Sequence, residues 1–333
     1  MSSKLSKLLA TAAFGLSAAL LSMPGAAQAQ AGGAQAYPSR AIRFVVPYPA
    51  GGGTDTMARV IGTRLNEAWG QPVVVENRAG AAGMIGNDLV AKAPADGYTV
   101  LFGITVMIQA PSLYPSIPYD VFRDFAPVTQ VALSADLFVV PADSPARTLK
   151  DFVAMAKANP KKFNYGSYGA GTSSHIHGEM LNGQAGLDLA HVAYKGAAPL
   201  MTDVLGGQIS SAFVDVTSAR PHLKSGKFRV LAITGGQRYK QLPDLPTFTE
   251  LGYKGYEPYG WFGVFVPAGT PRDIVDKLST EIARIIRTPE VSGRLTEMGL
   301  QPVGNTAQEF ASIMKTDAEV WAKVIKAGNI KLD

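Results

Sequence analysis

Val-Pro-Tyr-Pro-Ala-Gly-Gly-Gly-Thr-Asp, residues 46–55, is the strongest local signal in the chain. It follows the apolar run 42–46, which is typical of a buried strand, and it precedes a helical pattern over 54–69. Its three glycines let the backbone approach a ligand closely. We expect Thr54 or Asp55 to cap the helix, whose first N–H groups and positive dipole end favour an anion. The segment therefore predicts an anion-binding loop at the carboxyl end of a strand.

Other interpretations of this loop remain open, although two of them fit poorly. A dinucleotide-binding loop needs a third glycine at position 56, where the chain has Thr56, and a P-loop needs a lysine that is missing here. The remaining alternative is a tight turn with a helix cap and no ligand.

Outward from this loop, short β-rich runs alternate with helical patterns along most of the chain. We predict strands at 42–46, 73–75, 98–102, 137–140, 163–165, 190–193, 209–214, 229–233 and 262–266. We predict helices at 54–69, 83–93, 149–158, 173–184, 197–205 and 218–224, and a mostly helical segment from 272 to 326. Strands that alternate with helices indicate an α/β fold with parallel sheets covered on both faces.

The order of these elements predicts two lobes. The first lobe is expected to comprise 37–138 and 260–333, and the second lobe 139–259. Two crossings of the chain, near 136–141 and near 256–262, would form a hinge between them.

A second loop has the same character as the first and falls in the second lobe. Residues 165–175, Tyr-Gly-Ser-Tyr-Gly-Ala-Gly-Thr-Ser-Ser-His, lead from a predicted strand into a predicted helix. Hydroxyl groups at positions 167, 172, 173 and 174 add side-chain donors to the backbone donors. Neutral donors at a helix start can hold a carboxylate without a costly buried ion pair. A capped turn is the alternative, but two such loops facing each other could hold an anion from both sides.

Three further positions are candidates for the same site. The turn Arg78–Gly83 is glycine-rich, although Glu76 and Arg78 could simply pair with each other. Asp215 closes a strand and could either cap the following helix or accept a hydrogen bond from a ligand. Lys195, after Tyr194 at the end of another strand, could offset ligand charge or remain solvated.

The N-terminal residues have the composition of a signal peptide, which we assign to residues 1–31. Lys4 and Lys7 precede the apolar run Leu8–Leu21, and small-x-small sites place cleavage between residues 29 and 36. The alternative is an N-terminal membrane anchor, for which the apolar run is short. A chain without cysteine cannot be lipid-anchored or form disulfides, so we expect a free periplasmic protein.

Composition also argues against several other classes of protein. The chain has a net charge of +5, which loss of Lys4 and Lys7 would lower by two, and its basic residues are scattered. A nucleic-acid surface would show a basic stripe or a recognisable motif. A secreted hydrolase using Ser174, His175 and Asp215 is an alternative, but the chain lacks a Gly-x-Ser-x-Gly elbow. His175 and His177 diverge on a helix, so we expect no metal site. Because the motifs for catalysis are poor, we also expect that the chain is not an enzyme.

A series of motifs, in order from Tyr37 almost to the C-terminus, resembles the Bug (TctC-like) substrate-binding receptors of tripartite tricarboxylate transporters. Besides residues 46–55, the matching stretches are Tyr-Pro-Ser-Arg at 37–40, Gly-Gln-Pro-Val-Val-Val-Glu-Asn-Arg at 70–78, Asp-Gly-Tyr-Thr at 96–99, Gly-Thr-Ser-Ser-His at 171–175, Val-Ala-Tyr-Lys-Gly at 192–196, Asp-Val-Leu-Gly-Gly-Gln at 203–208, Pro-Asp-Leu-Pro-Thr at 243–247 and Pro-Ala-Gly-Thr-Pro at 267–271.

This resemblance implies a two-lobed, type II periplasmic binding fold with a small mono- or dicarboxylate between the lobes. It also implies delivery of the ligand to the membrane permease of a tripartite transporter, without a cofactor; a monomer is expected. The residues expected to contact the ligand are Tyr48, Ala50, Gly51, Gly52, Thr54, Asp55, Ser167, Tyr168, Gly169, Ala170, Gly171, Thr172, Ser173, Ser174, Tyr194, Lys195 and Asp215.

The chain departs from the family at one place that tends to set specificity. The family commonly has Asn or Leu-Pro after the aspartate that matches Asp215, whereas this chain continues Val-Thr-Ser. The identity of the ligand's far end therefore stays open. A receptor that signals to a membrane sensor kinase is a further alternative, because sensing and transport need the same closure.

Overall fold

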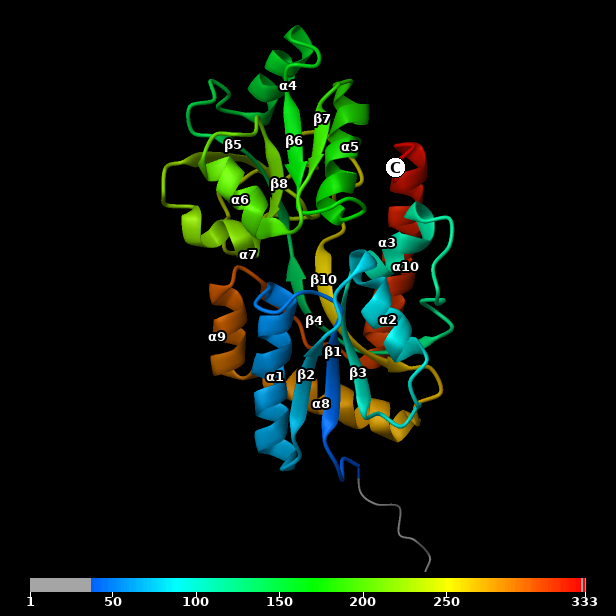
Figure 1. Ribbon diagram of the computed structural model, residues 1–333. Coiled ribbons are helices and arrows are strands. Elements are labelled where there is room, and N and C mark those ends of the chain that lie inside the picture. Colours follow the sequence, from blue (N-terminus) through cyan, green and yellow to red (C-terminus); the bar gives the residue numbers. More distant parts are fainter. Residues whose placement is uncertain (1–36, 331, 333) are drawn as a thin grey trace, which may run out of the picture. The chain divides into compact units, whose positions relative to one another are not determined.

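The computed structural model describes residues 37–330 and 332, so the predicted signal peptide lies outside the described residues. Within the described residues the chain forms two separate β-sheets, each flanked by helices (Figure 1). None of the helices in this part of the chain combines the length and the apolar composition that a membrane crossing would require.

The first sheet has six strands in the order β11-β4-β10-β3-β1-β2. These strands are β1 (Ile42–Val46), β2 (Val73–Asn77), β3 (Thr99–Ile104), β4 (Phe125–Ser134), β10 (Gly260–Pro267) and β11 (Gln301–Pro302). Four of the five residues of β1 are buried, because helices cover both faces of the sheet at this strand.

The prediction of a parallel sheet is wrong for half of the strands of the first sheet. β1, β2 and β3 are parallel, but β10 is antiparallel to both β3 and β4, and β11 is antiparallel to β4. β10 returns from the second sheet and inserts between β3 and β4, and such an antiparallel neighbour needs no crossover helix. The ten-residue β4 was not predicted: it contains Pro127 and the polar pair Thr129 and Gln130, all within a mostly buried strand.

The second sheet has five strands in the order β7-β6-β8-β5-β9. These strands are β5 (Asp136–Pro141), β6 (Asn164–Ser167), β7 (Ala190–Ala193), β8 (Ala212–Asp215) and β9 (Phe228–Ile233). The sheet is also mixed, since β5 is antiparallel to both β8 and β9.

The chain passes between the sheets twice. It leaves the first sheet at Ser134 and enters the second at Asp136, and it returns between Ile233 and Gly260. The assignment of residues 37–138 with 260–333 to one lobe and 139–259 to the other stays a prediction, as does the hinge.

The helices are α1 (Gly53–Trp69), α2 (Met84–Ala91), α3 (Val106–Leu113), α4 (Leu149–Ala158), α5 (Ser173–Ala185), α6 (Ala197–Leu205), α7 (Val216–Ala219), α8 (Arg272–Arg287), α9 (Pro289–Glu297) and α10 (Ala307–Ala327), with the 3-10 turns η1 (Ala81–Gly83) and η2 (Arg220–His222). The helix expected at 218–224 is therefore replaced by α7 and η2. α3 was not predicted, because it is short and contains Pro111.

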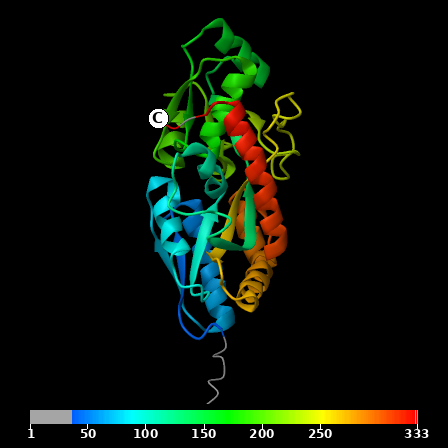
Figure 2. The same ribbon diagram turned by 90° about the vertical axis from the view of Figure 1, so that its right-hand side faces the viewer.

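One apolar cluster joins the two sheets. It includes Val45 of β1, Phe138 of β5 and Trp321 of α10, all of them fully buried. α10 extends from the first sheet to the second (Figure 2), where Trp321 lies 5.4 Å, ring centre to ring centre, from His177 of α5. Gln109 of α3 also donates to the hydroxyl of Ser173 at the start of α5, at 3.0 Å. These contacts hold the two sheets together away from the crossing strands.

Candidate functional site

A cavity of about 910 Å³ is lined by residues from both sheets and their helices. From the first sheet and its helices these are Tyr48 to Thr54, Thr56, Ala82, Ile104, Thr105, Val106, Ser134, Gly260, Trp261, Phe262 and Met298. From the second they are Asp136, Tyr168, Thr172, Ser173, Lys195 to Pro199, Met201, Thr202, Leu205, Asp215, Thr217, Ser218 and His222. This volume is large enough for a small organic ligand.

The first wall of the cavity is the glycine loop before α1. Gly52 is the N-cap of α1 and makes no side-chain cap, so the expectation that Thr54 or Asp55 caps this helix is wrong. Gly51 has a φ of 83°, a conformation that favours glycine, and this turn brings the backbone of the loop to the cavity. The loop therefore offers backbone N–H groups rather than a capping side chain.

Asp55 has a structural role in the same loop. Its carboxylate accepts a hydrogen bond from the Gly51 N–H at 2.9 Å, and it is paired with Arg59 and Asn77. Burial alone would raise the pKa of Asp55, but the hydrogen bonds from Arg59, Gly51 and Asn77 outweigh it and leave the pKa below its ordinary value. Asp55 is thus an ionised group that fixes the loop from behind.

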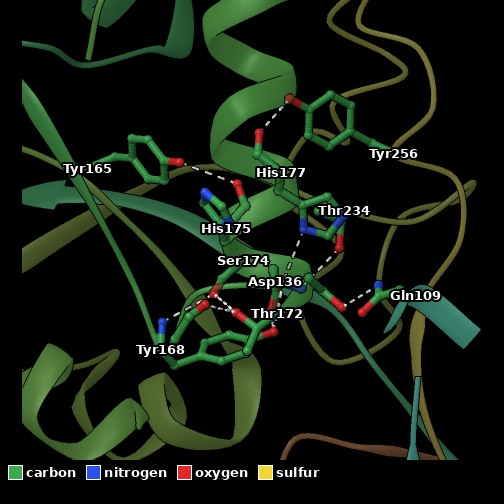
Figure 3. A network of polar contacts seen from close by, with 12 residues as sticks. Gln109, Asp136, Tyr165, Tyr168, Thr172, Ser174, His175, His177, Thr234 and Tyr256 are labelled. Atoms are coloured by element: carbon green, nitrogen blue, oxygen red, sulfur yellow. Dashed lines mark hydrogen bonds and ion pairs between the residues drawn. The ribbon is translucent and has the colours of Figure 1, made fainter. Parts of the chain in front are cut away.

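The second wall is the loop between β6 and α5. The Thr172 hydroxyl donates to the Gly169 carbonyl at 2.6 Å and lies 2.9 Å from the Ser174 hydroxyl, which accepts the Tyr168 N–H (Figure 3). Thr172 and Ser173 line the cavity, whereas Ser174 is fully buried behind them. The hydroxyls predicted to hold a ligand therefore also hold the loop in its own conformation.

Two stacked histidines support this loop from the side away from the cavity. The rings of His175 and His191 lie 4.0 Å apart, and the Gly171 N–H donates to Nδ1 of His175. Nε2 of His191 is 2.7 Å from the Ser167 hydroxyl. Burial, and then the adjacent His175, lower the pKa of His191 to about 4, so this ring is neutral near pH 7.

The third wall contains the starts of α6 and α7. Gly196 is the N-cap of α6, and Asp215 is the N-cap of α7, where its carboxylate accepts the Ser218 N–H at 2.9 Å. Asp215 thus caps this helix, which is one of the two roles that the sequence allowed, and it also lines the cavity. A hydrogen bond from a ligand to Asp215 stays a prediction. Burial raises the pKa of Asp215, the charge of Asp136 raises it further, and the Ser218 hydrogen bonds act in the opposite direction.

Asp136 was not predicted to belong to the site. Its carboxylate accepts hydrogen bonds from the Tyr168 hydroxyl at 3.2 Å, and one oxygen lies 2.9 Å from Nδ1 of the buried His177 (Figure 3). The Asp136 N–H donates to the Thr234 hydroxyl, which anchors the first residue of β5. An acidic residue that opens an otherwise apolar strand was the available signal in the sequence.

Four helices of eight residues or more begin at the cavity. The N-cap and first residues of α1, α3, α5 and α6 all contribute to its lining. Each helix start carries unpaired N–H groups and the positive end of a dipole. The cavity therefore favours an anionic group even though Lys195 is the one lysine or arginine among its lining residues.

Ten of the predicted contact residues line the cavity, and seven do not. The lining residues are Tyr48, Ala50, Gly51, Gly52, Thr54, Tyr168, Thr172, Ser173, Lys195 and Asp215. The other seven are Asp55, Ser167, Gly169, Ala170, Gly171, Ser174 and Tyr194, and the Tyr194 hydroxyl donates to Asp203 instead. A ligand contact for any of the seventeen stays a prediction. Residues 104–106 were missed although they lie at the carboxyl end of β3, where α/β sheets place ligands.

Known proteins are similar to this chain over most of its length. A model of the tripartite tricarboxylate transporter family receptors matches residues 57–330. A UPF0065 protein from the tcbD–tcbE intergenic region of Pseudomonas sp. strain P51 is 41% identical over 291 residues, which are 87% of each chain.

Solved structures show the same fold. Periplasmic binding protein BugD is 35% identical, with a TM-score of 0.80 over 89% of this chain and all of that one. The R. palustris protein Rpa4515, determined with adipate, is 34% identical, with a TM-score of 0.82 over 89% of this chain and all of that one. The predicted α/β, two-lobed, type II periplasmic binding fold is therefore confirmed.

Proposed function

Because the chain belongs to the family of tripartite tricarboxylate transporter receptors, we propose that it captures a small carboxylate between its lobes and delivers it to a membrane permease. The family consists of periplasmic solute-binding receptors. The proposed location of this chain is accordingly the periplasm, and its proposed state is a monomer without a cofactor.

The convergence of four helix starts on one cavity carries this proposal. Backbone N–H groups of α1 on one side and of α5 and α6 on the other can donate to the same carboxylate. These donors are neutral, so the ligand charge is stabilised without the desolvation of a buried cation. The similar protein Rpa4515 was determined with adipate, which supports a carboxylate as the ligand class.

Binding is expected to favour a closed arrangement of the lobes. A ligand that contacts both walls gains more interactions when the walls approach than when they separate, and it therefore shifts the population toward closure. The closed form is the species we propose a permease recognises.

Calorimetric titration with a panel of aliphatic and aromatic carboxylates tests the proposal. We expect at least one member to bind, and to be recovered chemically unchanged, as a receptor without catalytic activity requires. A panel in which nothing binds would contradict the proposal, and ligand turnover would contradict the non-catalytic role.

Two substitutions test the second loop. Thr172→Ala and Ser174→Ala are each expected to weaken binding by about 1–3 kcal/mol, because they remove hydroxyls that donate to the ligand or hold the loop. Thr316→Ala, which removes an exposed hydroxyl from α10, is the matched control and should leave affinity unchanged. Unchanged affinity in both loop variants would contradict a role for this loop.

A further inference from the structure

Two aspartates, Asp136 and Asp215, form one end of the cavity. They are direct partners in the antiparallel pairing of β5 with β8, so their side chains project from the same face of the sheet. Both residues line the cavity. The side chain of Asp136 is 6% exposed. Two carboxyl groups thus lie side by side at this end of the cavity.

No lysine or arginine within residues 37–330 forms an ion pair with either aspartate. Asp136 is bonded to the Tyr168 hydroxyl and to His177, and Nε2 of His177 has no hydrogen-bond partner in the described part of the chain. Asp215 forms no ion pair within residues 37–330, and Ser218 is its hydrogen-bond donor. Lys195 and His222 line the cavity too, but neither is paired with Asp215.

Two neighbouring carboxylates are energetically costly without a cationic partner. Like charges on directly opposite residues of a sheet repel. Burial, followed by the charges of Asp136 and Asp215, keeps the pKa of Tyr168 well above its ordinary value, so its phenol donates and carries no charge. The buried hydroxyls of Tyr48 and Thr217, also at the cavity, have no partner in the described residues.

We propose that Asp136 and Asp215 determine specificity by selecting a carboxylate whose far end carries a protonated nitrogen. This inference rests on the proposed function, because the helix starts bind the carboxylate end of the same ligand. The ammonium donates to Asp215 and offsets the charge of the pair, while a second carboxylate at that position is repelled. The apolar side chains of Met201, Leu205 and Met298 cover the carbon chain between the two ends.

Matched ligands of equal length provide the test. Wild-type protein is titrated calorimetrically with 6-aminohexanoate, adipate and hexanoate, and with the four-carbon set 4-aminobutanoate, succinate and butanoate. We expect the amino acid of at least one set to bind about tenfold or more tightly than its dicarboxylate, as a charge-assisted hydrogen bond allows. Asp215→Asn should remove that advantage and leave hexanoate or butanoate affinity within about threefold.

The variants separate charge from structure. Asparagine is as good an N-cap as aspartate, so Asp215→Asn is expected to keep α7. Asp136→Asn provides a second neutralising change that retains the Tyr168 contact. Asp203→Asn, whose carboxylate is bonded to Tyr194 and does not line the cavity, is the control and should keep the wild-type order of affinities.

The outcomes are distinguishable. One outcome is that a dicarboxylate binds most tightly to wild type and that Asp215→Asn and Asp136→Asn leave the order of affinities unchanged. This result would overturn the inference but preserve the proposed function. The same would follow if 6-hydroxyhexanoate bound as tightly as 6-aminohexanoate. No binding by any member of either set or of the wider carboxylate panel would overturn the proposed function, and the inference with it.

Discussion

Gly178, in the interior of α5, is expected to be intolerant of any side chain. A Cβ at this position would lie 1.9 Å from Cε2 and 2.3 Å from Cζ of Tyr165. That ring has no room to move, because it is fully buried, stacks on His191 at 4.9 Å and donates its hydroxyl to Glu179 at 2.5 Å. Overpacking of this kind costs about 1–3 kcal/mol, and the pinned ring places Gly178→Ala at the upper end.

The helix preference for alanine works in the opposite direction. Replacing glycine inside a helix normally stabilises it by about 1 kcal/mol. The net effect of Gly178→Ala is therefore a loss of about 2 kcal/mol. Gly183, five positions along the same helix, provides the matched control: it is exposed and an added Cβ would meet nothing within 4 Å. Gly183→Ala should stabilise the protein by about 0.5–1 kcal/mol.

Urea denaturation of both variants measures this contrast, with the slope of the transition checked to be unchanged. A smaller cost of Gly178→Ala in a Tyr165→Leu background would identify the ring as the cause. If Gly178→Ala and Gly183→Ala change stability in the same direction, the packing argument is wrong.

Three further predictions concern stability and pH. Burial raises the pKa of Asp317 to about 6, with Trp261 acting in the opposite direction, so the ionised form is disfavoured on folding and stability should fall as pH rises from about 4 through 6. Asp317→Asn should therefore stabilise the protein by about 1–2 kcal/mol at pH 8, allowing for partial exposure. Near pH 3.5 the same substitution should give no gain in stability. Equal gains at both pH values would contradict this prediction. The pKa of His191 is depressed to about 4, so its contribution to the free energy of unfolding is complete above about pH 6.5 and is lost as the pH falls toward 4. After discounting for partial exposure, we expect the free energy of unfolding to fall by about 1–2 kcal/mol over this pH range. The His191→Gln variant should show a flatter dependence of unfolding on pH. Thr148 and Asp151 form a capping box at the start of α4, so Thr148→Ala should cost about 1 kcal/mol in thermal or urea unfolding, whereas Thr316→Ala in mid-helix should cost almost nothing.

Periodicity in the sequence predicted many of the regular elements of the fold. α4, β7 and α6 have the predicted bounds, because each has a clean period and a clear start or stop signal. β4 escaped prediction because Pro127 and two buried polar residues interrupt its apolar pattern. The antiparallel insertion of β10 could not be foreseen either, since strand order depends on contacts between distant segments.

The site was predicted where the local sequence carries its own signal. The glycine loop before α1 and the hydroxyl-rich loop before α5 are contiguous motifs, and both line the cavity. The position of Asp136 in the site depends on contacts with distant parts of the chain. Asp136 belongs to the site only because β5 lies beside β8 and because Tyr168 and His177 bond to its carboxylate. Long-range pairing of this kind has no signature in a single sequence.

Because four helix starts line the cavity, main-chain N–H groups are the donors that we propose for the ligand's carboxylate. This arrangement affects how the ligand preference of such a receptor can change in evolution. A peptide N–H is present whichever residue occupies the position. Under the proposed function, point substitutions should therefore leave binding of the ligand's carboxylate nearly intact as long as the turns keep their conformation. The opposite end is built from side chains and can be exchanged one residue at a time. If the proposed function holds, substitutions at that end change which ligand is selected while the carboxylate is still bound.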